Sequence, residues 1–280
     1  MPALSLVTTC MGRLAHLQQS LPRMAAQADV ECILVDYACP QQSGQWAAGN
    51  LPGVRVLRLE QAAHFSAAHA RNLGAAQATA PWLAFVDADV LLADDFAADV
   101  APLLQAGRYY RPAPLAPDLW GCCLVARDVF AHVGGYDEAL QSWGGEDDDL
   151  YHRLRWLAGQ QPGEFPAGLL DFISHSDAER IAHGDGAERW LSQRANALYL
   201  HIKYDLMAVM QRAELDLGQR QALYREVRRT VLGSGASNAR VEIRLPPELK
   251  VPLSGWGIRR TWLFDLERIP GTPENPFAGA

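Results

Sequence analysis

The sequence predicts an α/β protein in which helices cover both faces of a mostly parallel central sheet, followed by a mainly helical C-terminal extension. Short apolar runs alternate with longer amphipathic segments over residues 1–90, which is the order of strands and helices around a parallel sheet. Two of these runs end directly at aspartates, and after residue 188 apolar residues recur at helical spacing. We expect one domain at residues 1–180 and a second at residues 181–280.

The first half of the chain supplies the sheet in β-α-β order. The predicted strands are Leu4–Val7, Glu31–Val35, Val54–Leu59 and Trp82–Val86, and the predicted helices are Arg13–Gln27 and Ser66–Ala78. Asp36 follows the second of these strands, and Asp87 and Asp89 follow the fourth. Because ligands bind beyond the carboxyl ends of parallel strands, these aspartates are candidate binding residues.

The later elements are assigned from turn residues and helical periodicity. We expect a helix at Asp94–Gln105, an extended loop at Arg111–Pro117, a strand at Gly121–Ala126, a turn at Val133–Asp137 and a helix at Glu146–Leu157. Further helices are expected over residues 188–209 and at Gln219–Val231. The proline-rich last fifty residues are expected to be irregular, held only by their aromatic side chains.

Composition and charge exclude several classes of function. The net charge of −7 gives no chain-wide basic field, so no nucleic-acid partner is expected. The apolar runs are far shorter than the ~20 residues of a membrane span, and the N-terminus shows no signal-peptide pattern. Five cysteines without CxxC spacing indicate reduced thiols. We therefore expect a soluble, cytoplasmic protein, with peripheral attachment to a membrane left open.

The motif Asp87-Ala88-Asp89 is a candidate metal site. Its two carboxylates leave an extended backbone on opposite sides, so one can bind a divalent cation while the other orients ligands. The alternative is a surface turn, because this short motif is common by chance. His175 lies at the end of another apolar run, where it either completes the metal site with Asp89 or serves as a hydrogen-bonded structural residue.

The motif Trp143-Gly144-Gly145-Glu146-Asp147-Asp148-Asp149 is more specific. Four adjacent carboxylates repel one another, which raises the proton affinity that a general base needs. A solvated helix start would explain the acidity alone, but an aromatic residue on a glycine hinge is typical of a closing lid. Asp149 and Arg153 lie four residues apart, which predicts an ion pair along the helix.

These motifs, with Gly134-Gly135-Tyr136-Asp137-Glu138 and His175-Ser176, occur in an order that resembles nucleotide-sugar glycosyltransferases of the GT-A fold. The set is similar to family 2 transferases that carry the galactosyltransferase-type C-terminal motif, as in β-1,4-galactosyltransferases, chondroitin polymerases and polypeptide N-acetylgalactosaminyltransferases. The resemblance covers residues 4–177 and implies a Rossmann-like GT-A domain that binds a sugar nucleotide. From residue 181 onward no resemblance is found.

The resemblance implies roles for individual residues in donor and metal binding. The implied donor-binding residues are Arg13, Asp36, Phe65, Arg71, Asp87, Trp143 and Gly145. Among them, Asp36 would face the nucleotide base, Arg71 would be the donor-side cation and Trp143 would close over the donor. Asp89 would bind the metal, with His175 as a further ligand and Asp87 in support. Phe172 stands where the pattern has a methionine ligand, and a phenyl ring cannot coordinate a metal.

For catalysis, the resemblance implies that Asp147 deprotonates the acceptor hydroxyl, while Glu146 and Asp148 hold the acceptor. The expected reaction is a metal-dependent, inverting transfer of a Gal, GalNAc, Glc or GlcNAc-type sugar from a nucleoside diphosphate sugar. A UDP-linked donor and Mn²⁺ are favoured, with Mg²⁺ as the second choice of metal. A glycan, a lipid-linked sugar and a peptide all remain open as acceptors.

Three other functions remain open. A retaining transferase of the same fold would produce the opposite anomer. A catalytically silent sugar-nucleotide-binding or assembly subunit would release no diphosphate, and a nucleotide-sugar hydrolase would release it without an acceptor. The amphipathic C-terminal helices could also pair two subunits.

Overall fold

The computed structural model describes residues 2–141, 143–174, 179, 182–184, 189–234, 240–249 and 251–266. The chain forms two compact units, one of Met1–Asp137 with Glu146–His175 and one of Glu138–Gly145 with Ser176–Ala280. The segment before the acidic motif therefore belongs to the C-terminal unit, and the acidic motif itself to the first. Among the described residues, no helix has the length and apolar character needed to cross a membrane.

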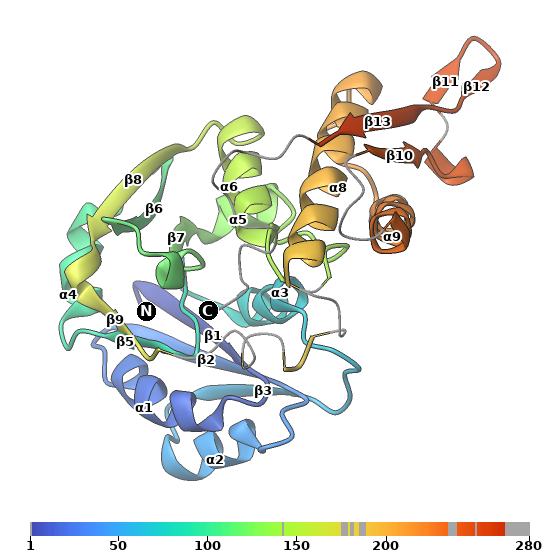
Figure 1. Ribbon diagram of the computed structural model, residues 1–280. Helices are drawn as coiled ribbons and strands as arrows, with labels where there is room; N and C mark the ends of the chain where they lie inside the picture. Colours follow the sequence, from blue (N-terminus) through green and yellow to red (C-terminus); the bar gives the residue numbers. More distant parts are fainter. Residues whose placement is uncertain are drawn as a thin grey trace. The chain divides into compact units, whose positions relative to one another are not determined.

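A seven-stranded sheet forms the first unit, in the order β3-β2-β1-β4-β7-β6-β8 (Figure 1). Its strands are β1 (Leu4–Cys10), β2 (Val30–Tyr37), β3 (Arg55–Leu59), β4 (Trp82–Phe85), β6 (Arg108–Ala113), β7 (Cys123–Ala126) and β8 (Gln161–Pro166). β1 to β4 are parallel, β7 runs antiparallel to both β4 and β6, and β8 is parallel to β6. A small separate sheet pairs β5 (Val90–Leu92) with β9 (Leu170–Phe172).

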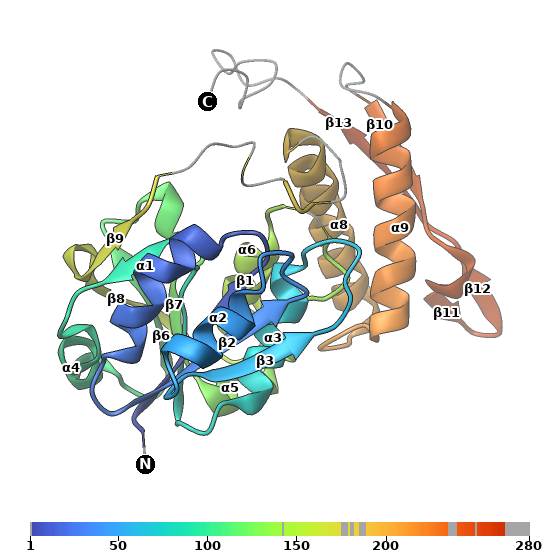
Figure 2. The same ribbon diagram turned by 90° about the horizontal axis from the view of Figure 1, so that it is seen from below.

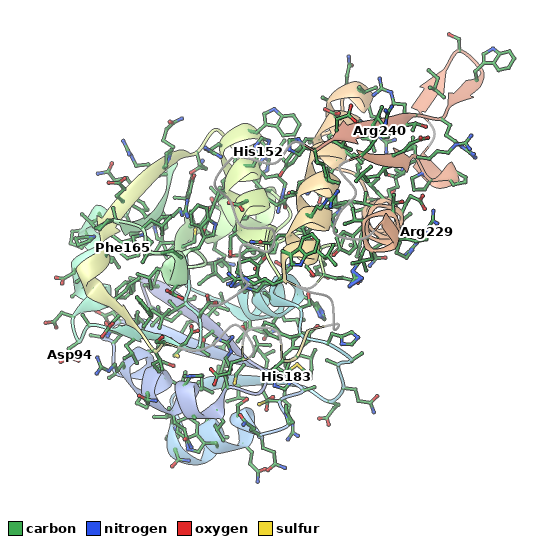
Figure 3. All side chains as sticks on the ribbon, in the orientation of Figure 1. Asp94, His152, Phe165, His183, Arg229 and Arg240 are labelled. Atoms are coloured by element: carbon green, nitrogen blue, oxygen red, sulfur yellow. The ribbon has the colours of Figure 1, made fainter. Side chains whose placement is uncertain are left out.

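Helices cover both faces of the sheet, as the alternating pattern predicts (Figures 1 and 2). One face packs against α1 (Leu14–Ala25), α2 (Ser43–Asn50) and α4 (Phe96–Val100), and the other against α3 (Ala67–Gln77), α5 (Arg127–His132) and α6 (Glu146–Trp156). Phe165 of β8, labelled in Figure 3, packs edge-to-face on Phe96, with ring centroids 5.8 Å apart. The expected α/β fold class is confirmed.

Helix α3 lies unusually close to the sheet at Gly74. A Cβ atom at this position would come within 2.4 Å of Cγ1 of Val7 on β1 and 3.2 Å of Cγ2 of Val35 on β2. Only glycine permits this approach without displacing the helix. Arg71 lies three residues earlier on the same helix, so the close packing also fixes the height of its side chain above the sheet.

The C-terminal unit is mainly helical, with α8 (Arg189–Met210) and α9 (Leu217–Ser234) side by side (Figure 2). Their apolar faces share a core with Val241 and Ile243 of β10. The expectation of an irregular tail is wrong for its described part. β10 (Arg240–Arg244) pairs with β13 (Thr261–Asp265), and β11 (Val251–Leu253) pairs with β12 (Trp256–Ile258).

Two other sequence expectations need correction. The chain around Arg111 is the end of β6, so the extended loop starts only after Ala113. The helix expected at Asp94–Gln105 is two short pieces, α4 and the 3₁₀ turn Ala101–Leu103, because Pro102 has no N–H to continue the α-helical pattern. Three further 3₁₀ turns lie at Pro117–Leu119, Ala167–Leu169 and Pro247–Leu249.

Candidate active site

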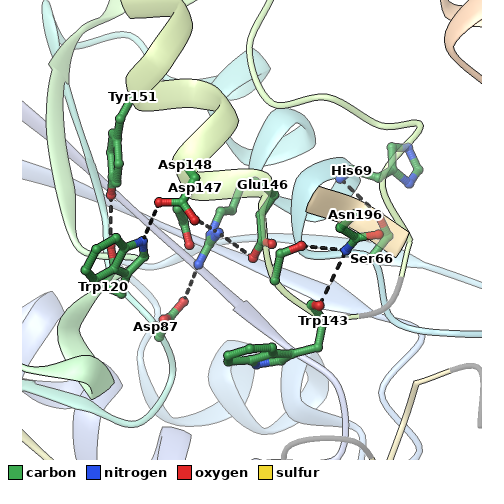
Figure 4. Close-up of polar contacts among 12 residues, drawn as sticks. Ser66, His69, Asp87, Trp120, Trp143, Glu146, Asp147, Asp148, Tyr151 and Asn196 are labelled. Carbon is green, nitrogen blue, oxygen red and sulfur yellow. Dashed lines mark hydrogen bonds and ion pairs between the residues drawn. The ribbon is translucent and has the colours of Figure 1, made fainter. Parts of the chain in front are cut away.

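One buried guanidinium joins three acidic side chains at the carboxyl end of the sheet. Arg71 of α3 is 5% exposed. Its Nη2 donates to Oδ1 of Asp87, just beyond β4, at 2.8 Å, and its Nη1 donates to Oδ1 of Asp147, in the first turn of α6, at 3.0 Å. Oε1 of Glu146 lies 3.5 Å from the same Nη1 (Figure 4). Two segments distant from α3 in sequence, the end of β4 and the start of α6, thus converge on one cation.

Burial changes the proton affinity of this cluster. Loss of solvent raises the pKa of Asp147 to about 8, with Arg71 acting in the opposite direction and Glu146 and Asp87 adding to the increase. The pKa of Glu146 is also raised, first by burial and then by the neighbouring carboxylates. A carboxyl group with raised proton affinity has the pKa that a general base needs.

The turn that contains Gly135 and Tyr136 packs against Arg71 and its neighbour Asn72. Asn72 of α3 donates to the carbonyl of Tyr136 at 2.9 Å and accepts the N–H of the same residue at 2.8 Å. At Gly135, whose φ is +68°, a Cβ would lie 2.6 Å from Oδ1 of Asn72, so the turn requires glycine. It places the ring of Tyr136 5.1 Å from the guanidinium carbon of Arg71, in a cation–π contact.

The site also contains a contact that sequence reasoning missed. A Cβ at Gly121 would lie 2.6 Å from Nη2 of Arg71 and 2.9 Å from Oδ2 of Asp87. The backbone before β7 therefore closes directly over the Arg71–Asp87 pair. The only signal for it in the sequence is a single glycine, which has no distinguishing neighbours.

Asp89 forms a second arginine–aspartate pair. Nη1 of Arg13, the residue preceding α1, donates to Oδ2 of Asp89 at 2.7 Å. The carboxylate oxygens of Asp87 and Asp89 are the donor type that Mg²⁺ and Mn²⁺ prefer, and such ions often complete their coordination with substrate phosphates. The chemistry of the two aspartates is compatible with a hard divalent cation, and their role as metal ligands stays a prediction. The described residues hold no cluster of three metal-ligating side chains, and His175 lies outside the described residues.

Asp36 has a structural role at the end of β2. Its carboxylate is fully buried, with Oδ1 accepting the N–H of Cys39 and Oδ2 the N–H of Gly44, both at 2.8 Å. It therefore holds the loop after β2 against the strand. Its contact with a nucleotide base stays a prediction. Phe65 lies edge-on to the ring of Tyr37, with centroids 5.5 Å apart, and its role in donor binding also stays a prediction.

Beside the acidic cluster, Asp148 holds an exposed indole. Nε1 of Trp120 donates to Oδ1 of Asp148 at 3.2 Å, and the hydroxyl of Tyr151 donates to the carbonyl of Trp120 at 2.9 Å (Figure 4). The guanidinium of Arg111 lies between the rings of Trp120 and Tyr151, 4.3 Å from each centroid. The predicted ion pair between Asp149 and Arg153 is confirmed, at 2.5 Å.

The last two predicted donor residues, Trp143 and Gly145, lie in the C-terminal unit. The guanidinium carbon of Arg189, the first residue of α8, is 3.7 Å from the ring centroid of Trp143. Gly144 and Gly145 have φ values of +91° and +93°. Backbone of this conformation favours glycine, while the role of the segment in donor binding stays a prediction.

Comparison with known protein families covers most of the first unit. Residues 5–111 match the model of glycosyl transferase family 2, and residues 106–167 match the model described as the N-terminal domain of galactosyltransferase. Two relatives from Drosophila melanogaster are similar over short stretches. N-acetylgalactosaminyltransferase 6 is 31% identical over 94 residues, and polypeptide N-acetylgalactosaminyltransferase 8 is 34% identical over 74 residues. These stretches are 29% and 26% of this chain, but only 14% and 12% of the two relatives.

Solved structures share the fold at low sequence identity. S. aureus TarS 1–349 in complex with UDP-GlcNAc has a TM-score of 0.59 and 13% identity, covering 82% of this chain and 73% of the TarS chain. The mannosyltransferase PcManGT from Pyrobaculum calidifontis, in complex with GDP-Man and Mn²⁺, has a TM-score of 0.55 and 15% identity, covering 85% and 76%. The predicted resemblance to GT-A transferases of family 2 is confirmed.

Proposed function

We propose that this chain, a GT-A glycosyltransferase by its family 2 match and its fold, moves a sugar from a nucleoside diphosphate donor to an acceptor hydroxyl with inversion at the anomeric carbon. The observation that carries the proposal is the convergence of Asp87, Glu146 and Asp147 on Arg71 at the carboxyl end of the sheet. A UDP-linked hexose or N-acetylhexosamine is the favoured donor, since a neighbour in fold was solved with UDP-GlcNAc.

Asp147 acts as the base. It takes the proton of the acceptor hydroxyl, whose oxygen attacks the anomeric carbon on the face opposite the diphosphate. The bond between that carbon and the diphosphate oxygen breaks, and the nucleoside diphosphate leaves with both electrons. Arg71 keeps a positive charge beside the reacting groups, where it offsets the negative charge on the leaving diphosphate. Glu146 and Asp148, which flank Asp147 in the chain, hold the acceptor.

Asp87 and Asp89 would hold a divalent cation, Mn²⁺ or Mg²⁺, which neutralises the leaving diphosphate when bound. A neighbour in fold solved with Mn²⁺ supports this assignment. The pairing of β5 with β9 also supports this metal assignment. Just beyond that pairing, the N–H of Ile173 donates to the carbonyl of Asp89 at 2.8 Å. The chain therefore passes beside Asp89 two residues before His175, the third predicted ligand.

One assay separates the proposed function from its alternatives. The protein is incubated with a panel of nucleotide sugars, Mn²⁺ or Mg²⁺, and simple acceptors, while release of nucleoside diphosphate is measured. Transfer predicts acceptor-dependent release, whereas hydrolysis gives release without acceptor and a silent subunit gives none. The proton coupling of the product's anomeric signal then distinguishes inversion from retention.

The activity should rise with pH through the titration of Asp147. Because burial raises the pKa of this carboxyl to about 8, it is protonated and inactive as a base below that pH and ionised above it. We expect kcat/KM to increase between about pH 6 and 9 and then to level off. A profile already flat at about pH 6 would contradict the base assignment, since a solvated aspartate has a pKa of about 4.

Replacing Asp89 by alanine should abolish the effect of metal on donor binding. The variant removes one of the two carboxylates that fit a cation, so UDP should bind with the same affinity in Mn²⁺ and in chelator. In the parent protein we expect at least about a ten-fold difference, or 1.4 kcal/mol. Titration calorimetry measures both, with Asp99→Ala, an exposed aspartate on α4, as the control. A metal effect of equal size in Asp89→Ala would exclude this metal site.

A further inference from the structure

The loop of Trp143, Gly144 and Gly145 lies along one face of helix α8 within the C-terminal unit. Arg189 covers the indole of Trp143. A Cβ at Gly144 would lie 3.2 Å from Cγ of Gln193, and a Cβ at Gly145 would lie 3.3 Å from Cβ of Asn196. These three helix residues are spaced by four and three positions, which places them on a single helix face. Each of the three loop residues therefore lies against one of these three residues of α8.

Asn196 makes the polar contacts between helix α8 and this loop. Its side chain is almost completely buried, at 1% exposure for the residue. Nδ2 donates to the carbonyl of Gly144 at 2.5 Å and lies 3.4 Å from the carbonyls of Gln141 and Trp143 (Figure 4). One amide group thus contacts three carbonyl oxygens of the chain before α6. An amide N–H₂ has two hydrogens, so a third carbonyl is held only by sharing them.

Tyr224 of α9 fixes the direction in which this amide points. Its hydroxyl is 2.8 Å from Oδ1 of Asn196 and 2.9 Å from the carbonyl of Gln141, and the residue is 1% exposed. A hydroxyl donates a single proton, and Oδ1 of an amide can only accept. With Oδ1 facing Tyr224, the N–H₂ group of Asn196 must face the loop.

The loop cannot hold its own position. Gly144 and Gly145 both have positive φ, and glycine loses more conformational freedom on ordering than any other residue. Neither glycine has a side chain to anchor it, and the loop continues directly into Glu146 and Asp147 of α6. The restraint on its backbone comes from neighbouring side chains, among which Asn196 donates hydrogen bonds to the loop carbonyls.

We propose that Asn196, oriented by Tyr224, is a positioning residue that sets the conformation of the Trp143–Gly145 loop for sugar transfer. This inference rests on the proposed function, because Trp143 is the residue assigned to close over the donor. It would give a residue of helix α8 a positioning part in the reaction. Asn196 and Tyr224 touch no reacting atom and act through the loop alone.

The first test needs no substrate. In Asn196→Asp the two N–H donors are replaced by an anionic oxygen that faces carbonyl oxygens, and Tyr224→Phe removes only the hydroxyl. Hydrogen–deuterium exchange of the peptide covering residues 139–147 should be faster in both variants than in the parent. Thr230→Val is the matched control, because it removes a hydroxyl of α9 that donates within the helix, to the carbonyl of Glu226. Unchanged exchange in Asn196→Asp would overturn the proposal.

The second test separates positioning from general stability. Loss of one buried hydrogen bond should lower kcat/KM for the donor about ten-fold in Asn196→Asp and about three-fold in Tyr224→Phe, while KM for the acceptor stays unchanged. Faster loop exchange with unchanged donor kinetics would overturn the positioning role and leave the proposed function standing. Conversely, a parent protein that releases no diphosphate from any nucleotide sugar would overturn the proposed function, while the exchange measurement would still decide whether Asn196 anchors the loop.

Discussion

Replacing Asp147 by asparagine should lower kcat by about 10²–10⁴-fold, the usual contribution of a general base, while leaving donor binding nearly unchanged. An amide cannot take the acceptor proton, but its oxygen can still accept the hydrogen bond from Nη1 of Arg71, now 3.0 Å long. The buried cluster therefore keeps its geometry and loses only its basic group. The effect should fall on the chemical step, because the donor is held by other residues.

Steady-state kinetics and calorimetry with UDP and Mn²⁺ measure the two quantities separately. Asp99→Asn is the matched control, since this exposed aspartate lies on α4 in the same unit and should leave both values unchanged. The pH dependence of kcat/KM should also disappear in Asp147→Asn. A variant with parental turnover would refute the base assignment, and one that no longer binds UDP would show that Asp147 is needed for the donor site itself.

Replacing Arg71 by methionine should lower the free energy of unfolding by about 3–5 kcal/mol, the cost of removing one partner from a buried ion pair. Methionine fills much of the same volume but leaves Asp87, Glu146 and Asp147 without their common cation. Activity should be lost as well, because the carboxylates no longer share a fixed partner. Arg71→Lys should rescue little, since an ammonium group lacks the fork that joins two carboxylates at once.

The loss in Arg71→Met should depend on pH. Arg71 lowers the pKa of both Asp147 and Glu146, so without it these carboxyls bind protons more readily. Once protonated they need no cation, so the destabilisation should be large at about pH 8 and smaller at about pH 5. Urea unfolding at both pH values measures it. Arg58→Met removes an exposed arginine 4.0 Å from Asp36 and should cost less than about 1 kcal/mol. An equal loss at both pH values would show that Arg71 contributes by packing alone.

Much of the first unit could be predicted from the sequence because its signals are local. Asp87 stands out where an apolar strand stops, and Asp147 stands out within four adjacent acids. The resemblance implied Arg71 as a donor-side cation but not as the partner of Asp147, because no local pattern shows which buried groups an arginine will meet. The pairing emerges only when α3, β4 and α6 pack together.

Other elements were missed for equally physical reasons. β8 carries two prolines and a glycine, residues that are unfavourable in strands, and is formed through its pairing with β6. In β10 the alternation of buried Val241 and Ile243 with exposed neighbours is a strand signal that the surrounding prolines obscured. Asn196 lies within a segment that the sequence predicts only as a helix, so its contact with the loop carries no local mark.

The absence of a side chain at Gly74 sets the distance between helix α3 and the sheet. It sets how deep the helix bearing Arg71 can settle onto β1 and β2, while Asp87 and Asp147 are held by other segments. A residue with a side chain at position 74 would push helix α3 away from β1 and β2, and with it the guanidinium of Arg71 away from Asp87 and Asp147. Engineering a new sugar preference should therefore start in the surrounding loops and leave Gly74 unchanged.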